Sequence, residues 1–146
     1  MKHLPVLFGY HASNLGNSHV PLSLCSWWNT KQLPSRLYVP SLDKNQHHSW
    51  VVPARTGIRK SLMYRFGGPT SPKEAVVKFF KQKEGDAEIV FLWAALPREV
   101  FEFFKSKGTK IIIERINCHR KSSRDILRAA YDHLGLPDSC SISDQD

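Results

Sequence analysis

Two kinds of hydrophobic pattern alternate along this chain. Short runs of apolar and β-branched residues predict buried strands, and segments in which apolar positions recur every three or four residues predict helices. The predicted strands are residues 4–10, 36–39, 88–93 and 110–114. The predicted helices are residues 19–30, a helix that starts at Pro72, one that runs from Pro97 to Gly108, and one that runs from Ser122 or Ser123 to Leu134. Strand and helix therefore alternate.

This alternation predicts an α/β fold, an open doubly wound parallel sheet of about four strands. Residues 1–137 are predicted to form one Rossmann-like domain and residues 138–146 a polar tail. Residues 41–70 are polar and basic, and they are interpreted as a long connection with one short helix near residues 58–64. In such a fold ligands bind beyond the carboxyl ends of the strands, which here are the loops at 9–18, 93–96 and 114–121.

The charge of the chain indicates an anionic ligand, and its cysteine and apolar content exclude two classes of protein. The net charge of +8 is concentrated in residues 51–85, which hold eight basic and two acidic residues. Such a patch attracts a phosphorylated ligand, an anionic lipid surface or nucleic acid alike. Three widely spaced cysteines exclude a disulfide framework, and no apolar stretch approaches the ~20 residues of a membrane helix. We expect a cytoplasmic protein, with a peripheral place at the inner membrane face left open.

The loop at residues 9–18 is the first candidate binding element. It follows a predicted strand and precedes a helix, so its backbone N–H groups and the helix N-terminus are suited to a phosphate or a sugar hydroxyl. The alternative is a plain turn between strand and helix. The candidate binding residues in this loop are Gly9, His11, Asn14, Gly16 and Asn17.

The loop at residues 114–121 is the second candidate. It brings a carboxylate, a thiol and an imidazole to the end of a buried strand, as general base catalysis or anion contact requires. The alternative is a set of solvated surface charges. The adjacent Cys118 and His119 lack a second pair at zinc-ligand spacing, so a zinc site is not expected here. No metal and no cofactor are predicted for the protein. Trp93, at the end of another strand, suits either the core or a ligand platform.

The string IIIERINCHRKSSRDILRAAYDHLGLP (residues 111–137) resembles the fourth strand and following helix of the first domain in bacterial group 1 glycosyltransferases, the family 4 enzymes of the GT-B fold. That family has a strand ending in Val-Glu-Arg or a similar tripeptide, a polar loop with a His, and a helix that begins with Ile-Leu and contains a Tyr. The matching residues here are Glu114, Arg115, His119, Ile126, Leu127 and Tyr131. The opening LFGYHASNLGNSHVPLSLCSWW resembles the first strand and loop of the same domain.

The resemblance covers about two thirds of the chain, with two departures. Ala129 and Ala130 stand where family members carry acidic residues, and residues 93–96 lack the family's His or Gly. The family's second domain holds the nucleotide-sugar through two Glu eight positions apart, and none of the six Glu here has such a partner. The resemblance therefore implies the N-terminal, acceptor-side domain, or a fragment, of a retaining glycosyltransferase.

The resemblance also implies roles for residues. Glu114 and His119 would be catalytic, and Arg115, Asn117 and Trp93 would contact substrate together with the residues of the first loop. The implied partners are a nucleotide-sugar and an acceptor, bound through a second domain that this sequence does not contain. A rival hypothesis is a non-catalytic α/β module whose basic face binds anionic lipid or, less favoured, nucleic acid.

Overall fold

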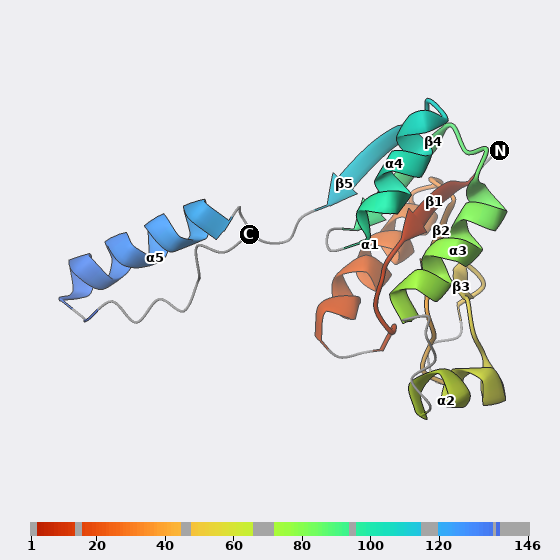
Figure 1. Ribbon diagram of the computed structural model, residues 1–146, viewed down its shortest axis with the longest axis horizontal. Coiled ribbons are helices and arrows are strands. Elements are labelled where there is room, and N and C mark those ends of the chain that lie inside the picture. Colours follow the sequence, from red (N-terminus) through yellow and green to blue (C-terminus); the bar gives the residue numbers. More distant parts are fainter. Residues whose placement is uncertain are drawn as a thin grey trace. The chain divides into compact units, whose positions relative to one another are not determined.

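The computed structural model describes residues 3–13, 16–44, 48–65, 72–93, 96–114, 120–135 and 137. The chain forms two compact units, residues 1–114 and residues 115–146. The first unit contains a sheet of five strands: β1 (Leu4–Leu7), β2 (Ser35–Val39), β3 (Val51–Pro53), β4 (Ile89–Trp93) and β5 (Lys110–Glu114). Its helices are η1 (Gly16–Ser18), α1 (His19–Thr30), α2 (Gly57–Arg65), α3 (Pro72–Glu84) and α4 (Arg98–Ser106). Figure 1 shows these elements.

The sheet is open and entirely parallel, with the strand order β3-β2-β1-β4-β5. The predicted fold class is thereby confirmed, including the parallel pairing of β4 with β5, in which Ile89 lies opposite Lys110 and Trp93 opposite Glu114. The sequence interpretation had about four strands, and the fifth is β3, inside the segment taken as a long connection. β3 is only three residues long and ends in Pro53, which an edge strand tolerates because its outer N–H groups need no partner.

Two hydrophobic cores lie on opposite faces of this sheet. On one face α1 packs Leu22 and Cys25 against Val6, Leu37 and Phe91. On the other face α3 and α4 cover the sheet (Figure 1), and their core is formed by Leu7, Tyr38, Val76, Val77, Phe80, Val90, Leu92, Leu96, Val100 and Phe104. A doubly wound sheet has helices on both faces. Each crossover is right-handed, so crossovers that run in opposite directions across the sheet place their helices on opposite faces.

Two glycines follow helices at positions where a side chain would clash or strain the backbone. At Gly85, just after α3, a Cβ would lie 2.6 Å from the carbonyl oxygen of Lys81. At Gly108, after α4, the backbone has φ +72°, which L side chains rarely adopt. The sequence predicted a stop at Gly108, and this prediction is correct. Both glycines let the chain turn directly into β4 and β5.

The burial of β5 differs from the sequence interpretation. The apolar run of this strand predicted cover on both faces, whereas Ile112 and Ile113 are exposed and only Ile111 packs against the α3–α4 core. The reason is position, because β5 is an edge strand paired to β4 alone. An apolar sequence favours a strand here, but it does not determine how many of the strand's side chains are buried.

The second unit contributes one described helix, α5 (Arg120–Leu134). It begins two to three residues before the Ser122 or Ser123 start that the sequence suggested and ends at the predicted Leu134. Among the helices described, none is both long and apolar enough to span a membrane.

Candidate functional site

The strand order of the sheet reverses at one point of its carboxyl edge. The chain proceeds from β1 to β2 and β3 on one side and to β4 and β5 on the other, so the reversal lies between β1 and β4. Gly9 leaves β1 at this point, where an added Cβ would lie 3.0 Å from side-chain carbons of both Leu96 and Lys73. Ligands of open α/β sheets bind at such a reversal. The predicted residue Gly9 thus lies where the fold favours a ligand.

Parallel pairing continues beyond β1 and β2 and fixes the loops that follow them. The Ala12 N–H donates to the Ser41 carbonyl at 3.0 Å, and the Asp43 N–H donates to the Ala12 carbonyl at 3.1 Å. Ala12 and Leu42 thereby form an isolated parallel bridge. This bridge places His11 opposite Ser41 and Asp43.

Four polar residues from three segments meet at this bridge, and we call them the His11 cluster: His11, Ser41, Asp43 and Lys60. The His11 Nδ1 lies 2.7 Å from the Ser41 hydroxyl, and its Nε2 lies 2.8 Å from Asp43 Oδ1. Lys60, from α2, donates to the Leu42 carbonyl at 3.0 Å and lies 3.8 Å from the same Asp43 oxygen. The imidazole is therefore held between a hydroxyl and a carboxylate.

This arrangement contains a Ser, a His and an Asp but lacks the geometry of a hydrolytic triad. Ser41 is fully buried, at 0% exposure, so a substrate cannot reach its hydroxyl. The Asp43 and His11 side chains are 49% and 31% exposed. Because His11 and Lys60 both approach Oδ1, the second oxygen, Oδ2, takes part in neither contact. An oriented, accessible carboxylate of this kind accepts a ligand hydroxyl's hydrogen bond or its proton.

The surroundings of Asp43 are strongly basic. It is the first acidic residue of the chain, and the next is Glu74. Lys73 lies near the same edge, with its ammonium 4.7 Å from the centre of the Tyr10 ring. Sequence reasoning found His11 but missed Ser41, Asp43 and Lys60. The isolated acidic charge in a basic stretch was the one available signal for Asp43.

The remaining residues predicted for the first loop are placed as follows. Gly16 begins η1, and Asn17 is exposed on it. The buried Ser18 hydroxyl donates to the Ser13 carbonyl at 2.8 Å and so closes this loop. Asn14 lies outside the described residues. The predicted loop thus has a fixed frame with Asn17 accessible on its surface.

Trp93 lies in the core beneath the edge. It is 3% exposed, and its ring packs edge-on against Phe8 with the ring centres 5.7 Å apart. Of the two roles that the sequence left open, the structure places this side chain in the core. We therefore do not include Trp93 in the proposed site.

Glu114 is half-buried at the carboxyl end of β5. It shares the edge with Gly9 and His11, although β4 lies between β1 and β5, so the two predicted loops leave from strands that are not neighbours. Arg115, Asn117 and His119 lie outside the described residues, as do residues 94–95 of the loop after β4. Within the described ranges no group of three or more His, Cys, Asp or Glu is placed to hold a metal ion.

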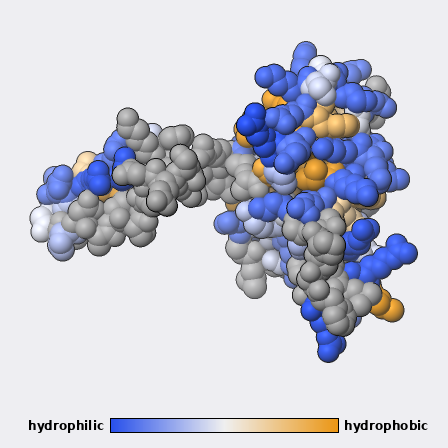
Figure 2. Space-filling view, viewed as in Figure 1, coloured by the Kyte–Doolittle hydropathy of each residue, from blue (hydrophilic) through white to orange (hydrophobic). Residues whose placement is uncertain are grey.

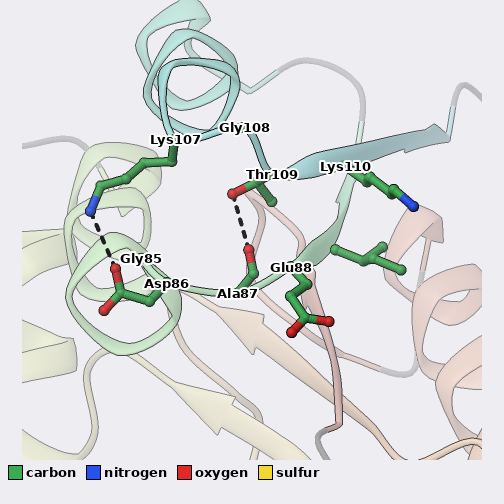
Figure 3. Close-up of a pocket in the computed structure, with 9 residues that line it drawn as sticks. Gly85, Asp86, Ala87, Glu88, Lys107, Gly108, Thr109 and Lys110 are labelled. Atoms are coloured by element: carbon green, nitrogen blue, oxygen red, sulfur yellow. Dashed lines mark hydrogen bonds and ion pairs between the residues drawn. The ribbon is translucent and has the colours of Figure 1, made fainter.

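Two hollows of the first unit lie at the opposite, amino edge of the sheet. One, of about 810 Å³, includes His3, Leu33, Glu84 and Ile112 among its lining residues. Another, of about 500 Å³, is drawn in Figure 3. There Lys107 pairs with Asp86 at 3.2 Å and the Thr109 hydroxyl donates to the Ala87 carbonyl at 3.0 Å. These polar groups pair with one another and close turns. The candidate site is therefore the His11 cluster at the carboxyl edge.

A buried polar network also links β2 to α3. The Tyr38 hydroxyl and His3 Nε2 both bond to Glu84 Oε1, the latter at 2.9 Å. Burial, together with the neighbouring Glu84 carboxylate, raises the pKa of the Tyr38 phenol well above its usual range. The phenol therefore remains a neutral donor, and the network ties the end of α3 to the sheet.

Replacing Tyr38 by Phe is expected to lower the free energy of unfolding by about 1–2 kcal/mol, because the Glu84 carboxylate loses a buried donor. Urea unfolding measures the change. Tyr10→Phe is the matched control, since Tyr10 is exposed, and it should change stability by less than about 0.5 kcal/mol. Equal effects of the two substitutions would show that the buried bond contributes nothing.

Comparison with protein-family models, with curated proteins and with solved structures found no match to this chain. The class of protein therefore follows from the structure itself. It is a Rossmann-like α/β protein with an open, all-parallel sheet of five strands and a polar cluster at its carboxyl edge.

Proposed function

We propose that residues 1–137 form the acceptor-side half of a retaining glycosyltransferase, which moves a sugar from a nucleotide-sugar to an acceptor hydroxyl. The observation that carries the proposal is the His11 cluster, an exposed carboxylate oriented by an imidazole beside the reversal point of the sheet. The likeness of residues 111–137 to the glycosyltransferase family supports the same assignment.

In this proposal Asp43 binds the acceptor. Its carboxylate accepts the hydrogen bond of the attacking hydroxyl, and His11 and Lys60 hold it in place. During transfer the hydroxyl oxygen bonds to the anomeric carbon and its proton passes to the Asp43 carboxylate. The bond between the anomeric carbon and the diphosphate oxygen breaks, and the nucleoside diphosphate leaves with the bonding electrons. Glu114 and His119 keep the catalytic roles that the resemblance implies, and Asn17, Arg115 and Asn117 remain substrate contacts.

The donor would be held by a second domain. The 146 residues contain no pair of Glu eight positions apart, which is the family's donor motif. A cleft between two domains excludes water and places cations and helix N-termini against the donor phosphates. One half alone offers a face for the acceptor and no closed cleft.

The proposal is tested by titrating the purified chain with acceptor saccharides while recording backbone amide NMR shifts. We expect shifts at residues 9–13 and 41–43 and none around Asp86 and Lys107. Incubation of the same chain with nucleotide-sugars and acceptors should give no transfer. Robust turnover by the chain alone would contradict the assignment of donor binding to a second domain. NMR shifts confined to residues at the amino edge would contradict the placement of the acceptor at the His11 cluster.

A further inference from the structure

One stretch of the chain contains basic residues and no acidic ones. Residues 44–73, which we call the basic lobe, contain six Lys or Arg residues and no Asp or Glu. They follow β2 and include β3 and α2. A charge run is often no more than a solvated surface, so the lobe needs a second feature to indicate a partner.

That feature is an exposed apolar residue among exposed cations. Ile58, in the first turn of α2, is 80% exposed, and Arg55 and Arg59 on either side of it are exposed as well. Within the part of the chain that the structure describes, neither arginine has an ion pair or a hydrogen-bonding side-chain partner. Figure 2 shows hydrophobic atoms among hydrophilic ones at the α2 end of the unit.

We propose that the part of the basic lobe around α2, with Arg55, Ile58 and Arg59 at its surface, docks the protein on an anionic phospholipid bilayer. Such a surface suits the boundary between lipid headgroups and acyl chains. The arginines would bind lipid phosphates there, and the isoleucine side chain would be buried among the acyl chains. A nucleic-acid backbone supplies the same negative charge but no apolar phase for Ile58. Charge complementarity and the exposed Ile58 together therefore favour the bilayer.

Docking through α2 has a consequence for the candidate site. Lys60 belongs to α2 and contacts the Leu42 carbonyl and Asp43, so the lobe is tied to the His11 cluster. A bilayer bound at α2 would lie near the carboxyl edge of the sheet. The inference does not depend on the transfer reaction and stands if that proposal fails.

The test is flotation of the full chain with vesicles of phosphatidylcholine alone or with 30% phosphatidylglycerol. We expect binding to the anionic vesicles only, and weakening of that binding as salt rises. Replacing both Arg55 and Arg59 by Ala should lower partitioning roughly 25-fold, since each cation near an anionic surface contributes about five-fold. Ile58→Asn should lower it roughly three- to tenfold.

The matched control removes the same charge elsewhere. Lys105 and Lys110 are exposed and lie on α4 and β5, and replacing both by Ala should change partitioning by less than about three-fold. Equal binding to neutral vesicles, or an equal loss in the control, would overturn the proposal. So would tight binding to single-stranded RNA with no vesicle binding, which would assign the lobe to nucleic acid.

Discussion

Replacing Asp43 by Asn is expected to lower kcat/KM for sugar transfer at least 100-fold in the chain joined to a donor-binding domain. Asn keeps the size of the side chain but cannot accept a proton, and general base catalysis contributes typically 10²- to 10⁴-fold. His11→Ala should also reduce transfer, because the carboxylate loses the imidazole that orients it at 2.8 Å. Both variants should keep the fold, since neither side chain belongs to the core.

The control for this prediction is Asp86→Asn, which makes the same chemical change at the opposite edge of the sheet. Its activity should match that of the unsubstituted protein. Activity and urea midpoint are measured together for each variant. Full activity of Asp43→Asn, or a loss of activity together with a large fall in its midpoint, would assign Asp43 to structure. Glu114→Ala and His119→Ala in the same protein test the catalytic roles taken from the resemblance.

The fold could be predicted from the sequence because its strands are nearly continuous apolar runs. Residues 110–114 were predicted with the boundaries that β5 has, and α1 spans the predicted residues 19–30. β1 ends at Leu7, three residues earlier than expected, because the chain there leaves the ladder for the loop toward Ala12. β3 was missed because three residues ending in Pro give no periodicity to detect.

The candidate site could be predicted only in part, because its residues are brought together by pairing of the chain beyond the strands. His11 stands directly after an apolar run, where function is sought in such folds. Asp43 and Lys60 come from a segment without a clear pattern, and their distance to His11 depends on the bridge between Ala12 and Leu42. No spacing in a single sequence encodes that bridge.

Alternation along the strands explains why Trp93 and His11 differ. In β4 the side chains of Phe91 and Trp93 point to the α1 face, so the indole packs with Phe8 in that core. A residue at the end of a strand still follows the strand's inward and outward alternation. His11 lies four residues beyond β1 and next to Ala12, whose bridge to Leu42 sets the position of the imidazole.

Stability should fall steeply in alkaline solution because of Cys25. This thiol is fully buried between α1 and the sheet, and burial raises its pKa to about 12 from an ordinary value of 9.0. The neutral thiol therefore favours the folded state. Its contribution is complete below pH 9 and is lost as pH rises toward 12, because the unfolded chain releases the proton first. Each unit of pKa difference corresponds to about 1.4 kcal/mol.

Between pH 8 and pH 10.5 this thiol alone should lower the free energy of unfolding by about 2 kcal/mol. The measurement compares urea unfolding of the protein and of Cys25→Ala at both pH values, with Cys118 and Cys140 replaced by Ser in each. Cys25→Ala should be less stable at pH 8, because it leaves a cavity, and should lose less stability on going to pH 10.5. Tyr38 is present in both proteins, so its effect on alkaline stability cancels when their losses are subtracted. The remaining difference is due to Cys25. Equal alkaline losses would show that the thiolate is as well solvated in the folded chain as in the unfolded one.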